Sequence, residues 1–261
     1  MGHKNIIHGI YWQEVLENKM GLIGHQAVLS DGQMSLADLW PECDSKVVIA
    51  GLNPAPPSVL SGHYYQGHNG KLMLQRVAHA ICKPEFLNGE YLDDALVAKG
   101  IGFTDLVMEP SVGEKDVSKQ KIAEALPDFE RKLRDRDVRL VISIYRHAGL
   151  HLLGKEKIER PGLQDELTSW GARVFVTPNP YAPVELTKPV YEELGHEVYG
   201  IQTAPVFKRV LPENWVEFYK TVYLVAANSS QSLDEIALTM YDDEVKKKLG
   251  AMPTPPWYLN K

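Results

Sequence analysis

Cysteine is scarce in this sequence: Cys43 and Cys82 are the only two among 261 residues. Two thiols cannot supply the four ligands of a usual iron–sulfur cluster or of an all-cysteine zinc site, and they make a poor disulfide framework. We therefore expect both to pack as small apolar groups in a reducing, cytoplasmic setting. His147 and His151 have a helical spacing that can bind zinc, but no known metal motif surrounds them, so we predict no metal and no other cofactor.

Long apolar runs and an excess of positive charge are also missing. No stretch approaches the roughly 20 apolar residues that cross a bilayer, and no signal-peptide pattern follows Met1, so we expect no membrane partner. Lys and Arg number 28 against 34 Asp and Glu, which gives a formal net charge of −6. Non-specific affinity for nucleic acid depends on cations that neutralise phosphates, so this composition disfavours a protein that coats nucleic acid. It leaves room for an enzyme that grips a short stretch of DNA with one local basic face.

What the sequence does have is a set of short, continuous apolar runs. They predict buried parallel strands at residues 46–51, 139–144 and 173–177, with a shorter strand at 102–107. Helical patterns separate them at residues 72–81, 118–134 and 146–153, and others follow at 213–226 and 233–249. Strands that alternate with helices predict a parallel sheet covered on both faces.

Two Asn-Pro pairs follow these strands. Asn53-Pro54 ends the first run, and Asn179-Pro180 ends the last. Proline cannot continue a strand ladder, so each pair marks a strand end. In parallel sheets ligands bind beyond the carboxyl ends of the strands. We therefore predict one site built from these two distant segments.

Three segments together resemble the mismatch-specific uracil/thymine branch of the uracil-DNA glycosylase superfamily. They are residues 47–55 with the Gly-His-Tyr-Tyr loop at 62–67, residues 100–107 with 115–119, and residues 174–180. The resemblance covers residues 36–185. It implies a three-layer α/β sandwich around a mostly parallel four-stranded sheet, in a single domain over residues 1–261 whose part at 186–261 is a helical C-terminal extension.

The sequence departs from the family pattern in two places. Ala55 stands where glycine is usual, and two prolines follow it. The second motif usually continues with small residues and an apolar side chain that wedges into the duplex, whereas here it continues with Tyr181-Ala-Pro-Val184. The wedge is Tyr181 or Val184, or it is absent, and the substrate preference stays open with it.

The resemblance also assigns roles to residues. Asn53 positions the attacking water, and Asn179, with backbone N–H groups of the 53–55 loop, stabilises the departing base. Tyr65 stacks on the extruded base, Thr104 and Asp105 buttress the loop, and His63 either lines the pocket or orders its loop. The predicted base-binding residues are Gly51, Leu52, Pro54, Ala55, His63, Tyr65, Asn69, Pro180 and Tyr181, and the predicted DNA-backbone contacts are Lys71, Lys119 and Lys188.

The function that these residues imply is that of a monomeric, monofunctional DNA glycosylase in base excision repair. It flips a damaged or mismatched base, such as uracil, thymine opposite guanine or a deaminated or adducted base, and hydrolyses the N-glycosidic bond. Two alternatives remain open. One is a relative that binds nucleic acid or nucleobases without turnover, and the other is a hydrolase of free nucleosides, for which an acidic chain is natural.

Overall fold

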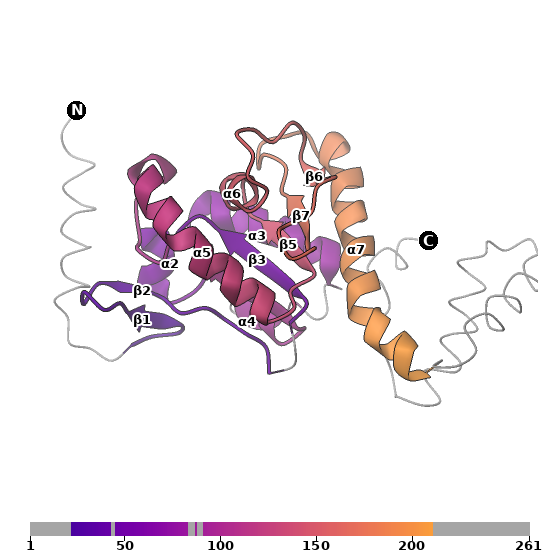
Figure 1. Cartoon of the computed structure of the whole chain (residues 1–261), viewed down its shortest axis with the longest axis horizontal. Helices are drawn as coiled ribbons and strands as arrows, with labels where there is room; N and C mark the ends of the chain where they lie inside the picture. The colour runs from indigo at the N-terminus through magenta and orange to yellow at the C-terminus, as the bar shows by residue number, and fades with distance from the viewer. Residues whose placement is uncertain (1–21, 43–44, 83–86, 88–90, 211–261) are drawn as a thin grey trace, which may run out of the picture.

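The computed structural model describes residues 22–42, 45–82, 87 and 91–210 (Figure 1). The strands are β1 (Gln26–Val28), β2 (Met34–Leu36), β3 (Val47–Gly51), β4 (Ile101–Asp105), β5 (Leu140–Ser143), β6 (Gly162–Leu163) and β7 (Arg173–Val176). The helices are α2 (Pro56–Ser61), α3 (His68–Ile81), α4 (Leu92–Val97), the 3₁₀ turn η2 (Glu114–Asp116), α5 (Lys119–Asp135), α6 (His147–Leu152) and α7 (Val184–Val210). The helices predicted at 213–226 and 233–249, and Cys43, lie outside the described residues.

The central sheet has the strand order β4-β3-β5-β7-β6. Its first four strands are parallel, as predicted, and the short β6 joins β7 antiparallel as a fifth strand. The predicted count of four strands was therefore one too low. Gly162 and Leu163 alone form β6, and two residues are too few to display a strand pattern in the sequence.

Helices cover both faces of this sheet. Side chains of a strand alternate between its faces, and in β3 Val47 and Ile49 pack into the core formed with α3, α4 and α7. Val48 and Ala50 point the other way, into the core formed with α5 and α6. Figure 1 shows α5 in front of β3 and α3 behind it. The layers confirm the predicted sandwich and explain why its strands are continuously apolar.

Helix α5 runs as a single helix although Pro127 lies inside it, and Ser118 caps its start by accepting a bond from the Lys121 amide at 3.1 Å. The long α7 begins at Val184, before the predicted start of the C-terminal extension at residue 186. Its Leu194 and Val198 are buried in the core, so the first part of the predicted C-terminal extension packs into the same core as α3.

Other expectations concern single features. Cys82 is buried, as expected for a thiol that packs as an apolar group. Within the described residues, no helix is both long enough and apolar enough to cross a membrane.

Candidate functional site

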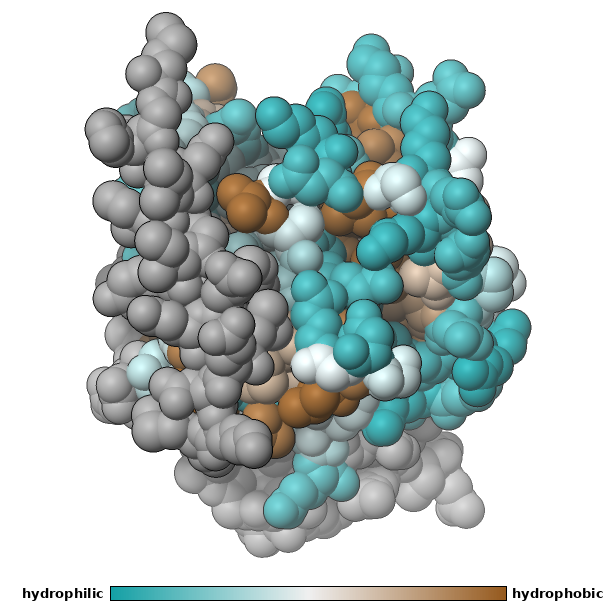
Figure 2. All heavy atoms as spheres, turned by 90° about the vertical axis from the view of Figure 1, so that its left-hand side faces the viewer, coloured by the Kyte–Doolittle hydropathy of each residue, from teal (hydrophilic) through white to brown (hydrophobic). Residues whose placement is uncertain are grey.

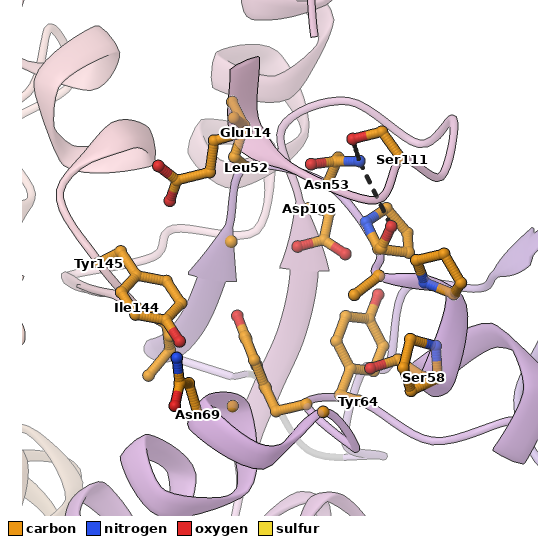
Figure 3. Close-up of a pocket in the computed structure, with 18 of the residues that line it drawn as sticks. Leu52, Asn53, Ser58, Tyr64, Asn69, Asp105, Ser111, Glu114, Ile144 and Tyr145 are labelled. Atoms are coloured by element: carbon orange, nitrogen blue, oxygen red, sulfur yellow. Dashed lines mark hydrogen bonds between the residues drawn. The ribbon is translucent and has the colours of Figure 1, made fainter. Parts of the chain in front are cut away.

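A cavity opens at the carboxyl end of β3. The chain passes from β3 to β4 on one side and then to β5 on the other, which makes this strand end a topological switch point, where open α/β sheets bind ligands. The cavity has a volume of about 1340 Å³ (Figure 3). Figure 2 shows the side of the molecule where α2 lies. Apolar patches on this side lie between hydrophilic residues.

The cavity brings together most of the predicted base-binding residues. Those that line it are Gly51, Leu52, Pro54, Ala55, Tyr65, Asn69 and Tyr181, and the predicted catalytic residue Asn53 lines it as well. The loop after β3 is held in place because it continues the pairing with the chain beyond β4: the Leu106 amide donates to the Gly51 carbonyl at 3.1 Å, and the Val107 amide donates to that of Leu52 at 2.8 Å. The strand end thus presents Asn53 at a fixed position.

The Asn53 side chain is held by its amide nitrogen. Nδ2 donates to Ser111 Oγ at 2.8 Å and lies 3.2 Å from the Glu109 carbonyl oxygen and 3.3 Å from that of Pro54. The Ser111 hydroxyl donates its own proton to the Gly113 carbonyl at 3.0 Å. Every partner is therefore an acceptor, so only the NH₂ end of the amide can face them. The carbonyl Oδ1 of Asn53 is left to face the cavity, where it can accept a hydrogen bond (Figure 3).

Ala55 fits its position without strain. It precedes α2 with φ −87° and ψ 149°, a conformation that any residue adopts. Its carbonyl accepts bonds from the Ser58 and Val59 amides at 2.9 and 3.2 Å. Pro56 and Pro57 occupy the first helical positions, where proline suits helix geometry. The departure from glycine therefore leaves the loop after Asn53 intact.

Tyr65 lines the cavity in a strained backbone conformation. Its φ is +58°, in the left-handed region that most residues avoid. A Cβ on Gly70 would lie 3.0 Å from the Tyr65 carbonyl oxygen, so a side chain there would crowd this turn. The Tyr65 hydroxyl is buried without a hydrogen-bond partner. Burial, and next the charge of Asp105, raise its pKa well above the usual value, so the group is a neutral phenol.

Asp105 also lines the cavity, which the sequence analysis did not anticipate. Its side chain is buried, and this burial, followed by the charge of Asp38, raises its pKa to about 7. The charge of Lys132 and a bond from the Gly51 backbone oppose the shift. Thr104, in contrast, does not line the cavity, and its hydroxyl donates to Asp38 Oδ1 at 2.7 Å.

Glu114 is a second cavity residue that sequence reasoning missed. Figure 3 shows Asn53 and Asp105 on one side of the cavity and Glu114 with Tyr145 on the other. Glu114 lies 2.7 Å from His147 Nε2, and this hydrogen bond lowers the carboxyl pKa, which keeps it ionised. The pair joins η2 to α6, and no local pattern announces such a contact. His147 Nε2 is thus the partner of Glu114.

The second Asn-Pro corner contributes less to the cavity than predicted. Asn179 is exposed, and its Oδ1 accepts a bond from the Tyr181 amide at 2.8 Å, which closes a local turn. Pro180 is buried, and neither residue lines the cavity. Tyr181 does line it, and its hydroxyl reaches across to Asn69 Oδ1 at 2.6 Å. The catalytic role of Asn179 stays a prediction, while Tyr181 bridges the cavity mouth.

The remaining predicted residues lie on the surface or beneath it. Lys71 is exposed in the first turn of α3, next to the residues of that helix that line the cavity. Lys119 is exposed at the start of α5, and Lys188 on α7 lies 3.9 Å from Glu192. His63 is buried outside the cavity, 3.2 Å from Asp93. Of the two interpretations of His63, this geometry matches the loop-ordering one.

Comparison with known proteins agrees with this geometry. No curated protein matches the chain. A family model described as the uracil DNA glycosylase superfamily matches residues 38–186 of the 261. The matched segment is more than half of the chain and contains β3, Asn53 and every lining residue of the cavity except one in the preceding strand, Leu36. The chain therefore belongs to the uracil DNA glycosylase superfamily.

Proposed function

We propose that the protein is a monofunctional DNA glycosylase that flips a damaged or mismatched base into the cavity and hydrolyses its N-glycosidic bond in base excision repair. Membership of the superfamily supports DNA glycosylase activity in general. Uracil is the first candidate base, and thymine opposite guanine and deaminated or adducted bases are the others. The observation that carries the proposal is the Asn53 amide, locked by Ser111 with its carbonyl oxygen facing the cavity.

In the proposed reaction Asn53 places the nucleophile. Its Oδ1 accepts a hydrogen bond from a water molecule and holds it behind C1′ of the extruded nucleotide. An amide takes up no proton near neutral pH, so Asn53 is not a general base and acts by position. The N-glycosidic bond breaks with its electron pair leaving on the base, the water oxygen bonds to C1′, and the proton that the water loses is taken up by the departed base.

The polar and charged groups of the cavity can stabilise the two fragments that form when the bond breaks, the sugar cation and the base anion. The sugar passes through a cationic, oxocarbenium-like state, and Glu114 supplies an ionised carboxylate to the same cavity. The cavity therefore contains a negative charge, although the residue at position 53 is an uncharged asparagine. The departing base carries negative charge, and we propose that backbone N–H groups of the 53–55 loop stabilise it.

The size of the cavity and its surroundings favour a nucleotide within DNA. A volume of about 1340 Å³ exceeds the roughly 300–1,000 Å³ of usual small-molecule pockets, which leaves room for flanking sugar and phosphate. We propose exposed Lys71 and Lys119 as phosphate contacts. Lys188 is the weaker candidate because Glu192 partly neutralises it. We propose that the protein acts as a monomer.

One assay separates this function from its alternatives. We expect single-turnover release of base from duplexes that carry uracil, thymine opposite guanine, hypoxanthine or an ethenoadduct, with uracil in the lead, and none from free deoxyuridine. Cleavage of free deoxyuridine alone would identify a nucleoside hydrolase. Duplex binding without release of any of these bases would identify a binding protein without turnover.

We predict that the ring of Tyr65, and not its hydroxyl, serves the reaction. Stacking on an aromatic ring contributes roughly 1–3 kcal/mol per base, so Tyr65→Ala should lower excision about tenfold to 100-fold. Tyr65→Phe should retain excision, and it should not lower the free energy of unfolding because the hydroxyl is buried without a partner. Excision assays and urea unfolding of both variants test this. Equal losses in the Phe and Ala variants would contradict a stacking role.

A further inference from the structure

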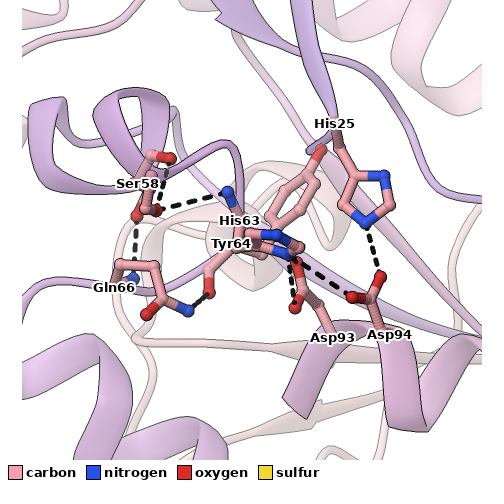
Figure 4. Close-up of polar contacts among 8 residues, drawn as sticks. His25, Ser58, His63, Tyr64, Gln66, Asp93 and Asp94 are labelled. Carbon is pink, nitrogen blue, oxygen red and sulfur yellow. Dashed lines mark hydrogen bonds and ion pairs between the residues drawn. The ribbon is translucent and has the colours of Figure 1, made fainter. Parts of the chain in front are cut away.

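We propose that His25, His63, Asp93 and Asp94 form a structural site for a zinc-class divalent cation, apart from the cavity. His25 precedes β1, His63 follows α2, and the two aspartates lie in the first turn of α4. Figure 4 shows the four side chains converging from these three segments. The partners are 30 and 69 residues apart in the chain, so they form no local metal motif. The expectation of no metal considered local motifs alone.

The distances around His63 fit an ion between the side chains. His63 Nδ1 lies 3.2 Å from both carboxylate oxygens of Asp93 and 3.8 Å from Asp94 Oδ2. Ligands at about 2.0–2.1 Å from a tetrahedral ion lie about 3.4 Å from one another. A direct charge-assisted bond is shorter, about 2.7–2.9 Å. Ligand atoms of His25, His63 and Asp93 all lie within 4.8 Å of one another, so one ion can contact all three once the side chains adjust.

The buried half of the site is held in place before any metal arrives. The Tyr64 amide donates to Asp93 Oδ2 at 2.8 Å, and Asp93 is fully buried. The His63 ring stacks on Tyr91 with 3.5 Å between the centroids and 4° between the planes. A Cβ on Gly24 would lie 2.9 Å from His63 Nε2, so only glycine permits this approach of the chain. Such preorganisation of ligands by a second layer raises metal affinity.

The exposed half of the site provides the route by which a cation enters. His25 Nε2 lies 2.6 Å from Asp94 Oδ1, and the Asp94 side chain is 53% exposed. On binding, the cation replaces the hydrogen bond between His25 Nε2 and Asp94 Oδ1 and takes both atoms as ligands. Two carboxylates then balance the two positive charges of the ion, so the buried Asp93 is neutralised. Imidazole and carboxylate ligands in this number suit zinc.

The site is structural because four protein ligands leave no open position. His63 is followed directly by Tyr64 and Tyr65, and Tyr65 lines the cavity. A bound ion therefore ties the aromatic loop of the cavity to α4 and to the segment before β1. This inference concerns the support of the site and stands whether or not the proposed excision is found.

Metal titration of the full chain tests the proposal. After treatment with EDTA, the protein should bind one equivalent of Zn²⁺ at micromolar or lower concentration in calorimetry. Co²⁺ should give the visible absorption of a tetrahedral site, and saturating Zn²⁺ should raise the Tm by several degrees, about what RT ln(1 + [L]/Kd) gives for a ligand at 100 times its Kd.

Matched variants identify the ligands. His25→Gln and Asp94→Asn change partly exposed side chains, so the fold should persist by circular dichroism, while the Zn²⁺ affinity should fall at least tenfold. His79→Gln, at an exposed histidine of α3, is the control and should bind as the parent does. Absence of one-to-one binding in the parent, or unchanged affinity in both ligand variants, would overturn the proposal.

Discussion

Replacement of Asn53 by alanine is expected to lower single-turnover excision by roughly 100-fold or more, which corresponds to about 3 kcal/mol of activation free energy. The physical reason is that Oδ1 is the group placed to hold the attacking water, while the same side chain contributes little to the grip on the DNA backbone. Affinity for a uracil-containing duplex should therefore change little. Rates under enzyme excess, together with equilibrium binding to the duplex, provide the measurement.

Ser111→Ala is the matched control for this substitution. It removes the closest partner of Asn53 Nδ2, at 2.8 Å, but leaves the carbonyl oxygens of Glu109 and Pro54 at 3.2 and 3.3 Å. We expect a loss smaller than that of Asn53→Ala, because the amide is held less firmly yet still carries Oδ1. If Asn53→Ala excises uracil at the parental rate, the water-positioning role is wrong.

Asp105→Asn is expected to change the pH dependence of stability. In the folded protein burial raises the pKa of Asp105 to about 7, whereas an unfolded chain releases this proton near pH 4. Between these values the folded state binds the extra proton, so its contribution to stability is fully present below about pH 4 and is lost as the pH rises through about 7. Over that whole range the loss is on the order of 4 kcal/mol.

Urea unfolding at pH 5 and pH 8 measures this effect. Asparagine does not titrate. From pH 5 to pH 8 the free energy of unfolding of the parent should therefore fall by on the order of 3 kcal/mol relative to that of Asp105→Asn. Asp128→Asn, at a carboxylate whose side chain is 79% exposed, is the control and should show no comparable gain. An unchanged difference between the parent and Asp105→Asn at the two pH values would mean that Asp105 is ionised in the folded protein.

Apolar patterning made much of the fold predictable from the sequence. Parallel strands buried on both faces appear as continuous runs, and residues 46–51, 139–144 and 173–177 became β3, β5 and β7. The strand end at Asn53-Pro54 was equally visible, because proline stops a ladder. Since that end lies at the switch point of the sheet, the sequence also indicated where the cavity lies, and most of the residues predicted for the site line it.

Sequence patterns could not predict features that depend on residues distant in the chain. Asp105 keeps its proton to about pH 7 only because the assembled core buries it beside Asp38, and burial is a property of the packed molecule. Glu114 meets His147 across two elements, and a side-chain pair of this kind carries no spacing rule. Local rules therefore placed the strand and its Asn-Pro corner, whereas the charges around the cavity were decided by packing.

The two Asn-Pro corners illustrate the same division. The sequence by itself determined that Asn53 and Asn179 both follow buried strands. Only the tertiary structure decided that they differ in use: Ser111 holds the Asn53 amide with its oxygen toward the cavity, while Asn179 is exposed and closes a turn with Tyr181. A motif specifies the backbone position of a side chain, but its direction depends on which hydrogen-bond partners the rest of the chain brings within reach.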